Sequence, residues 1–145
     1  MKRTLITEKV IHRQVCAFLK YQYPHVVFTS DMSGMRVTIG LRVEMQSKRS
    51  DKFKIPDLII LHPSNGSHGL LIEIKKSRSD VYTKDGKFKT SEHIKMQKKT
   101  LDTLNARGYL AVFGCGFEEC RDIIKKYFNT KRISNATELQ NIPDH

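Results

Sequence analysis

The sequence predicts an α/β fold in which a single sheet is flanked by helices. Short apolar runs rich in branched residues occur at 26–29, 58–61, 70–74 and 109–113, which is typical of strands. Apolar residues recur at helical spacing in three other segments, which lie before the first run, between the third and fourth runs, and after the fourth. The predicted order is therefore helix, three strands, helix, strand and a closing helix.

The first predicted helix follows Thr7, which is placed to cap it, and stops before Pro24. Its apolar stripe consists of Ile11, Val15, Phe18, Leu19 and Tyr23. Glu8 begins the same stripe, and two explanations compete for it. An acid in a first turn complements the helix dipole, or the carboxylate belongs to a site near the core. His12, one turn further on, is expected to be an ordinary half-buried histidine.

The stretch between the first two predicted strands is mostly polar. Residues 30–34 have the composition of a loop, and Asp31 is expected to support a turn through its own side-chain hydrogen bonds. Residues 37–45 fit both the alternation of a strand and a helical stripe, so periodicity leaves them open. A basic run then leads into Pro56-Asp57, and it contains Arg42, Lys48, Arg49, Lys52 and Lys54.

The runs at 58–61 and 70–74 flank the turn residues at 63–66, so together they predict a β-hairpin. If this hairpin folds about Asn65, Asp57 lies opposite Glu73. Opposed residues in an antiparallel pair have Cβ atoms about 5 Å apart. The sequence therefore predicts two carboxyl groups at one spot.

Lys75 joins these acids, because the period of two in a strand places it on the same face as Glu73. Two carboxylates at such a distance repel each other, and a divalent cation removes the conflict. The alternative is a surface hairpin in which Lys75 simply neutralises Glu73.

The chain beyond Lys75 is polar and rich in lysine, and it is expected to form a mobile loop. A helix is predicted from 91 to 107, with Gly108 as its C-cap. Gln97 lies within the apolar stripe of that helix. A buried amide without partners costs roughly 1 to 3 kcal/mol, so Gln97 either makes a capping or sheet-edge contact or reaches a site.

Length and composition indicate one domain at 1–128 and a polar tail at 129–145. The 26 lysines and arginines against 15 acids give a net charge of +11, which suits nucleic acid or reflects solubility alone. No run approaches the roughly 20 apolar residues of a membrane span, and no signal peptide is evident, so a cytoplasmic protein is expected. The three cysteines are expected to be reduced, and no organic cofactor is expected.

Asp57 followed by Glu73-Ile74-Lys75 resembles the PD-(D/E)xK nuclease signature. Over residues 4–128 the chain is similar to the virus-type replication-repair nuclease family, VRR-NUC, in its small single-domain phage form. The likeness rests on the stretches at 8–15, 30–34, 55–58, 69–76, 92–97, 108–111 and 114–117. Members of that family often carry a glycine three positions before the motif aspartate, where this chain has Lys54.

The resemblance implies a restriction-endonuclease-like core, with a central mixed four-stranded sheet in α-β-β-β-α-β order and a closing C-terminal helix. It favours a helix at 37–45. It also implies a DNA endonuclease that hydrolyses phosphodiester bonds with Mg²⁺, for which Mn²⁺ can substitute. The catalytic residues that it implies are Asp57, Glu73, Lys75, Gln97 and Glu8. The metal ligands that it implies are Asp57, Glu73, the backbone carbonyl of Ile74, and Glu8.

The implied substrate is branched DNA such as a Holliday junction, cut by a homodimer with one active site in each subunit. The expected DNA-binding residues are Lys76, Arg78, Lys98, Lys99, Arg49, Lys52 and Lys54. The mobile loop after Lys75, with lysines at 84, 87 and 89, is expected to order against DNA. The resemblance further implies a protein encoded by a phage or a bacterium. The alternative is a catalytically silent protein that keeps the nuclease fold and binds nucleic acid.

Overall fold

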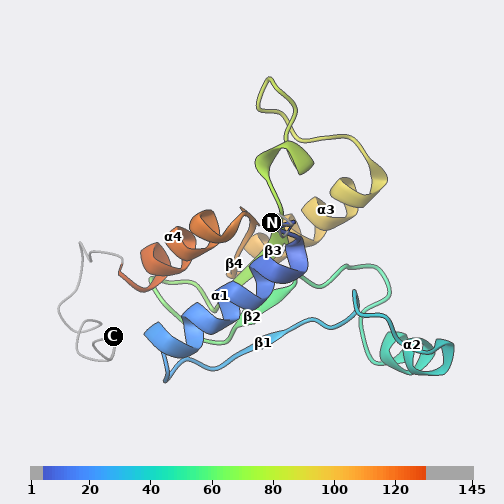
Figure 1. The fold of residues 1–145 in the computed structure, drawn as a ribbon, viewed down its shortest axis with the longest axis horizontal. Coiled ribbons are helices and arrows are strands. Elements are labelled where there is room, and N and C mark those ends of the chain that lie inside the picture. The colour runs from blue at the N-terminus through green and yellow to red at the C-terminus, as the bar shows by residue number, and fades with distance from the viewer. Residues whose placement is uncertain (1–4, 130–145) are drawn as a thin grey trace.

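The computed structural model describes residues 5–129 of the chain (Figure 1). Apart from Asn129, the predicted tail lies outside the described residues. The elements in chain order are α1 (Glu8–Gln22), β1 (Phe28–Ser30), α2 (Ile39–Ser47), β2 (Leu58–Ile60), β3 (Leu70–Lys75), the 3-10 helix η1 (Arg78–Asp80), α3 (Glu92–Ala106), β4 (Leu110–Cys115) and α4 (Phe117–Phe128). This order confirms the predicted α/β fold.

The four strands form one mixed sheet in the order β1-β2-β3-β4. β2 runs antiparallel to both β1 and β3, and β4 pairs in parallel with β3. Leu58 pairs with Ile72 and Ile60 with Leu70, so the register of the predicted hairpin is confirmed. Its turn contains Asn65 at a φ of 54°, a left-handed conformation that asparagine tolerates.

Helices cover both faces of the sheet, and β3 is therefore buried at all six positions. Leu70, Ile72 and Ile74 point to one face, where they join the core that α1 and α4 supply. Leu71 points to the other face, where α3 contributes Ile94 and Leu101. Figure 1 places α1 and α4 on one side of the sheet. Because side chains alternate along a strand, Glu73 and Lys75 lie on the face that α3 covers.

Thr7 and Gly108 cap their helices as predicted, whereas Ser91, expected as the first residue of its helix, is the N-cap. Thr7 Oγ1 accepts a hydrogen bond from Val10 N at 3.3 Å at the start of α1, and Ser91 Oγ accepts one from Ile94 N at 3.4 Å at the start of α3. Gly108 follows α3 with a φ of 92°, which is the left-handed conformation of a helix C-cap.

Each of the four strands differs from its predicted run by one or two residues at one end or both. β1 begins at Phe28, two residues later than expected, and β4 extends to Cys115 because it pairs with β3 as far as Lys75.

Close packing of α4 explains the glycine near the end of β4. A Cβ on Gly114 would overlap Cys120 Sγ and lie 2.8 Å from the Ile72 Cγ2 atom.

Two segments between the strands also have defined structure. The ambiguous stretch at 37–45 overlaps α2, which begins and ends two residues later, has no buried residue and lies away from α1 and α4 (Figure 1). A mobile loop was expected after Lys75. The structure instead has η1 and a β-bridge between Tyr82 and Phe88 in this segment. A contact between these two rings, which no periodic pattern reveals, stabilises that stretch. None of the helices within residues 5–129 is long and apolar enough to cross a membrane.

Candidate active site

Asp57 and Glu73 meet at the edge of the sheet where β2 begins and β3 ends. The pairing of Leu58 with Ile72 places Asp57 next to Glu73, one step beyond the ladder. Asp57 Oδ2 accepts a hydrogen bond from Ile74 N at 2.8 Å, which fixes the carboxyl group against β3. Glu73 is only 4% exposed, whereas Asp57 is half-buried. The two acids that the sequence predicts to be neighbours therefore are neighbours.

The environment of Glu73 strongly favours its neutral form. Burial makes the largest contribution, followed by the charge of Asp57, and together they raise the pKa of Glu73 to about 8. The positive charges of Lys75 and Lys54 oppose this shift without cancelling it. A protonated Glu73 can also share a hydrogen bond with Asp57, which adds to the rise in pKa.

Lys75 lies two residues beyond Glu73 on the same face of β3, and it is 5% exposed. Its charge lowers the pKa of Glu73, so the ammonium group is electrostatically part of the acid pair. Among residues 5–129, no acid lies within ion-pair distance of Lys75. The surface hairpin with a simple Glu73–Lys75 ion pair is therefore not what the structure has.

Gln97 of α3 is held directly on the acid pair. Its side chain is 2% exposed, and Nε2 donates a hydrogen bond to Glu73 Oε1 at 2.7 Å. The other atom of the amide, Oε1, is buried without a hydrogen-bond partner within the described part of the chain. A buried acceptor that is left unpaired is costly, and here it lies beside two carboxyl groups.

His93, Gln97 and Thr100 form a polar stripe along one side of α3. Gln97 Nε2 lies 3.1 Å from His93 Nε2, and Thr100 Oγ1 accepts a hydrogen bond from Lys54 N at 3.0 Å. Neither His93 nor Thr100 was predicted from the sequence. Their spacing of four and then three residues around Gln97 is the signal that could have found them.

Lys54 brings a second amine to this site. Its Nζ lies 3.4 and 3.5 Å from the two ring nitrogens of His93. Partial burial and then the charges of Lys54 and Lys75 lower the pKa of His93, so its ring stays neutral at pH 7. At the position where VRR-NUC sequences often have glycine, this chain therefore places a cation close to Glu73 and His93.

Within the described residues, Glu8 forms no hydrogen bond with the acid pair. It is exposed in the first turn of α1, and α1 packs on the face of the sheet opposite to α3. Among residues 5–129, no three side chains of His, Cys, Asp or Glu are grouped to hold a metal ion. The implied roles of Glu8 and of the Ile74 carbonyl as ligands therefore stay predictions.

The seven expected DNA-binding residues fall into two groups. Arg49, Arg78 and Lys98 are engaged with acids of the chain, at 2.8 Å from Asp31, 3.3 Å from Glu119 and 2.7 Å from Asp102 respectively. Lys52, Lys76 and Lys99 are exposed, and Lys54 is half-buried at the site. Asp31 also bonds Ser33, as its predicted turn requires, so Arg49 and Asp31 together hold the 31–49 segment.

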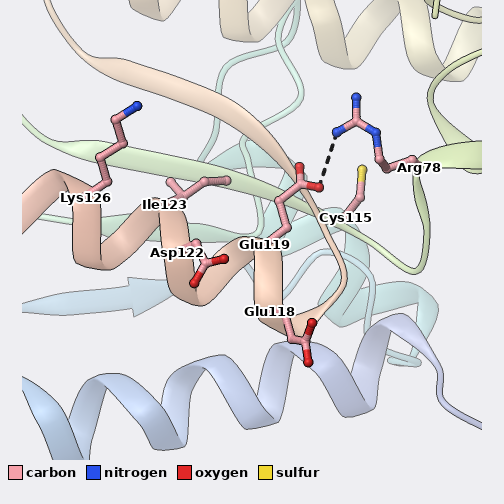
Figure 2. Close-up of a pocket in the computed structure, with 7 residues that line it drawn as sticks. All are labelled: Arg78, Cys115, Glu118, Glu119, Asp122, Ile123 and Lys126. Atoms are coloured by element: carbon pink, nitrogen blue, oxygen red, sulfur yellow. Dashed lines mark hydrogen bonds and ion pairs between the residues drawn. The ribbon is translucent and has the colours of Figure 1, made fainter.

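No hydrogen bond within residues 5–129 joins His12 or the three cysteines to the acid pair, although the pKa of His12 is raised, chiefly by a hydrogen bond with Cys16 and less by the charge of Asp57. His12 is half-buried, as expected, and its Nε2 lies 2.9 Å from Ser30 Oγ. All three cysteines are free thiols. A surface cavity of about 510 Å³ is lined by Arg78, Cys115, Glu118, Glu119, Asp122, Ile123 and Lys126, and Figure 2 shows Arg78 directed toward Glu119 there. None of the acid-pair residues lines this cavity.

The chain was compared with known proteins at the levels of sequence and structure. No family model and no curated protein matches its sequence. A solved structure described as a "VRR_NUC domain protein" is similar to 89% of this chain and 93% of that chain, with a TM-score of 0.59 and 23% sequence identity. The chain therefore shares the fold of a VRR_NUC domain protein.

Proposed function

We propose that this chain is a metal-dependent endonuclease that hydrolyses phosphodiester bonds of DNA. The observation that carries the proposal is the pair of carboxyl groups formed by half-buried Asp57 and buried Glu73, with Lys75 on the same face as Glu73 and Gln97 bonded to Glu73. Folding brings these four polar side chains together at the end of the sheet, where each is costly to bury alone. The fold shared with a VRR_NUC domain protein supports the same conclusion.

The chemistry of these donors fits Mg²⁺ or Mn²⁺. Both ions prefer oxygen ligands, and Mg²⁺ commonly takes one or two carboxylates and completes its shell with water and phosphate oxygens. Asp57 and Glu73 would hold the ion, and we propose the Ile74 carbonyl and Glu8 as further ligands. The unpaired Oε1 of Gln97 is an acceptor that a water molecule at this position would satisfy. A divalent cation would also relieve the repulsion that raises the pKa of Glu73.

Each residue of the site has a distinct task in this proposal. When bound, the cation would lower the pKa of a coordinated water and stabilise charge on the attacked phosphate. Gln97 fixes the orientation of the Glu73 carboxylate through its Nε2 hydrogen bond. Lys75 supplies a fixed positive charge beside the attacked phosphate and positions the water that attacks it. Lys54, His93 and Thr100 keep the segment before Asp57 against α3.

We further propose that the substrate is branched DNA, such as a four-way junction, and that the active form is a homodimer. Two identical active sites related by a two-fold axis can cut two strands symmetrically. The net charge of +11 favours a polyanionic substrate. The exposed lysines at 52, 76 and 99 would contact phosphates, because none of them is paired with an acid within residues 5–129.

The proposal is tested by incubating labelled four-way junction and linear duplex with the protein in Mg²⁺ or in EDTA. The comparison includes Glu73→Ala and the matched control Glu118→Ala, which changes an exposed acid of α4. We expect cutting in Mg²⁺ only, a loss of at least 100-fold in Glu73→Ala, and wild-type rates in the control. DNA binding without any cutting by the wild type would support the silent binding protein instead.

A further inference from the structure

A small hairpin at residues 81–89 stands out from the body of the protein between β3 and α3 (Figure 1). Tyr82 and Phe88 form its β-bridge. Backbone hydrogen bonds from Thr83 N to Lys87 O at 2.7 Å and from Lys89 N to Val81 O at 2.8 Å extend the pairing. The turn is closed at Gly86, whose φ of 77° suits glycine. We call this segment the 81–89 hairpin.

Aromatic and cationic side chains fix the base of the 81–89 hairpin. The rings of Tyr82 and Phe88 have centroids 5.0 Å apart, and Phe88 lies 6.1 Å from Phe113 of β4. Arg78 lies over the Tyr82 ring at 4.6 Å, and Lys98 lies over the Phe88 ring at 4.9 Å. The hairpin is therefore anchored to the sheet and to α3, and its tip is held in a defined position.

The 81–89 hairpin carries excess positive charge. Lys84, Lys87 and Lys89 are exposed, and Asp85 is the only acid among residues 81–89. Within the described part of the chain, none of these lysines forms an ion pair. Like charges gathered on a short protrusion repel one another, and an external polyanion would relieve that repulsion.

The hairpin is connected at both ends to the candidate active site. The preceding strand, β3, carries Glu73 and Lys75, and the following helix, α3, carries His93 and Gln97. The three lysines of the hairpin therefore lie on a continuous stretch of chain that leaves the site after Lys75 and returns to it at His93.

We propose that the 81–89 hairpin grips the phosphate backbone of the DNA on which the acid pair acts, through Lys84, Lys87 and Lys89. This inference rests on the proposed function and adds to it the element that holds the substrate. Because its base is anchored, the hairpin holds these three lysines within one short segment, which limits how far apart their phosphate contacts can lie.

The test measures binding of a fluorescent linear duplex in EDTA, at several salt concentrations, for the full chain. The hairpin variant is Lys84→Gln/Lys87→Gln/Lys89→Gln. The matched control is Lys20→Gln/Lys125→Gln/Lys126→Gln, which removes the same charge from exposed positions of α1 and α4. Thermal unfolding followed by circular dichroism establishes that both variants fold like the wild type.

We expect the hairpin variant to bind at least tenfold more weakly and the control to stay within about threefold of wild type. The slope of log affinity against log salt should fall in magnitude by about 0.9 for each phosphate that a lysine no longer neutralises, hence by up to about 2.7 in the hairpin variant. Equal reductions of affinity in both variants, or an unchanged affinity in the hairpin variant, would overturn the inference.

The two proposals fail in distinguishable ways. If the wild type cuts DNA in Mg²⁺ while the hairpin variant binds like the control, only the role of the hairpin is wrong. If the wild type binds DNA, the hairpin variant binds it more weakly, and neither protein cuts it, the hairpin inference stands and the nuclease proposal is wrong. A wild type that binds no DNA overturns both.

Discussion

Glu73 is an acid that the fold keeps beside another acid and away from water. Burial, and next the charge of Asp57, raise the pKa of Glu73 from 4.5 to about 8. Between these two pH values the folded protein holds a proton that the unfolded chain has released. The stabilisation contributed by this proton is therefore fully present below pH 4.5 and is lost as the pH rises through about 8.

This linkage gives a prediction for Glu73→Gln, in which a neutral side chain replaces the titrating acid. In metal-free buffer, the free energy of unfolding of the wild type should fall relative to that of Glu73→Gln as the pH rises from 4.5 to 8. The slope of this difference is at most about 1.4 kcal/mol per pH unit. Urea unfolding at a series of pH values measures it. Parallel pH profiles for the two proteins would show that Glu73 titrates normally.

The three thiols differ sharply in their surroundings. Burial raises the pKa of the Cys16 thiol, but hydrogen bonds from His12 and Ser30 and the nearby charges of His12 and Lys20 outweigh it and leave that pKa below its ordinary value. Burial dominates at the other two thiols, raising the pKa of Cys115 to about 11 and that of Cys120 to about 12.

Cys16 should therefore be the first thiol to react with iodoacetamide, because the thiolate is the nucleophile. Peptide mass spectrometry of the folded protein at pH 7.5 should find Cys16 labelled several-fold faster than Cys115 and Cys120. His12→Gln should slow the labelling of Cys16 and leave the other two unchanged. Labelling of Cys115 at the rate of Cys16 would contradict this assignment.

Side chains along one side of α3 hold Glu73 and the segment before Asp57 in place. Thr100 accepts the hydrogen bond from Lys54 N and so holds the segment that leads to Asp57. Thr100→Val should leave this N–H without its partner and cost about 1 to 3 kcal/mol of unfolding free energy. The DNA cutting rate should fall as well, because Asp57 loses its support.

Urea unfolding and a cleavage assay check this prediction, with Thr103→Val as the control. The Thr103 hydroxyl donates only to Lys99 O of its own helix, at 2.8 Å, so its loss should cost less than about 1 kcal/mol and leave cutting intact. Equal effects at Thr100 and Thr103 would mean that the hydrogen bond to Lys54 does not support the site.

Local sequence patterns predicted some of these elements and missed others. The turn at Asn65 and the period of two fixed the register that pairs Asp57 with Glu73, because both are local properties of a hairpin. The 81–89 hairpin escaped prediction because its order comes from ring contacts with neighbours such as Phe113, which is distant in sequence. The start of β1 was also missed, since its partner Ile60 and not local propensity decides which residues pair.

Only part of the site could be predicted from the sequence, for a related reason. Asp57, Glu73, Lys75 and Gln97 lie in recognisable patterns on a hairpin and a helical stripe. The proximity of Lys54 to His93 depends on how the loop before β2 packs on α3, and no local pattern encodes that packing. The ion pair of Arg49 with Asp31 at 2.8 Å was likewise not predicted, and the expected contact of Arg49 with DNA stays a prediction.

The two faces of the sheet differ in the kinds of side chain that they bury. The core beneath α1 and α4 is almost entirely apolar, whereas the face beneath α3 contains the buried polar residues Glu73, Lys75, Gln97 and Thr100. One face therefore supplies stability, and the other combines packing with a polar site. The chain as a whole has a net charge of +11, whereas the site contains a pair of acids.

The most direct test of the active site is a double-mutant cycle on the rate of Mg²⁺-dependent DNA cutting, with Asp57→Asn, Glu73→Gln and the double variant. Residues that act as one unit are strongly non-additive. We predict that each single substitution lowers the rate at least 100-fold and that the double variant is no slower than the slower single. A single variant that cuts at the wild-type rate, or rate reductions that multiply in the double variant, would contradict the claim that the two carboxyl groups form one active site.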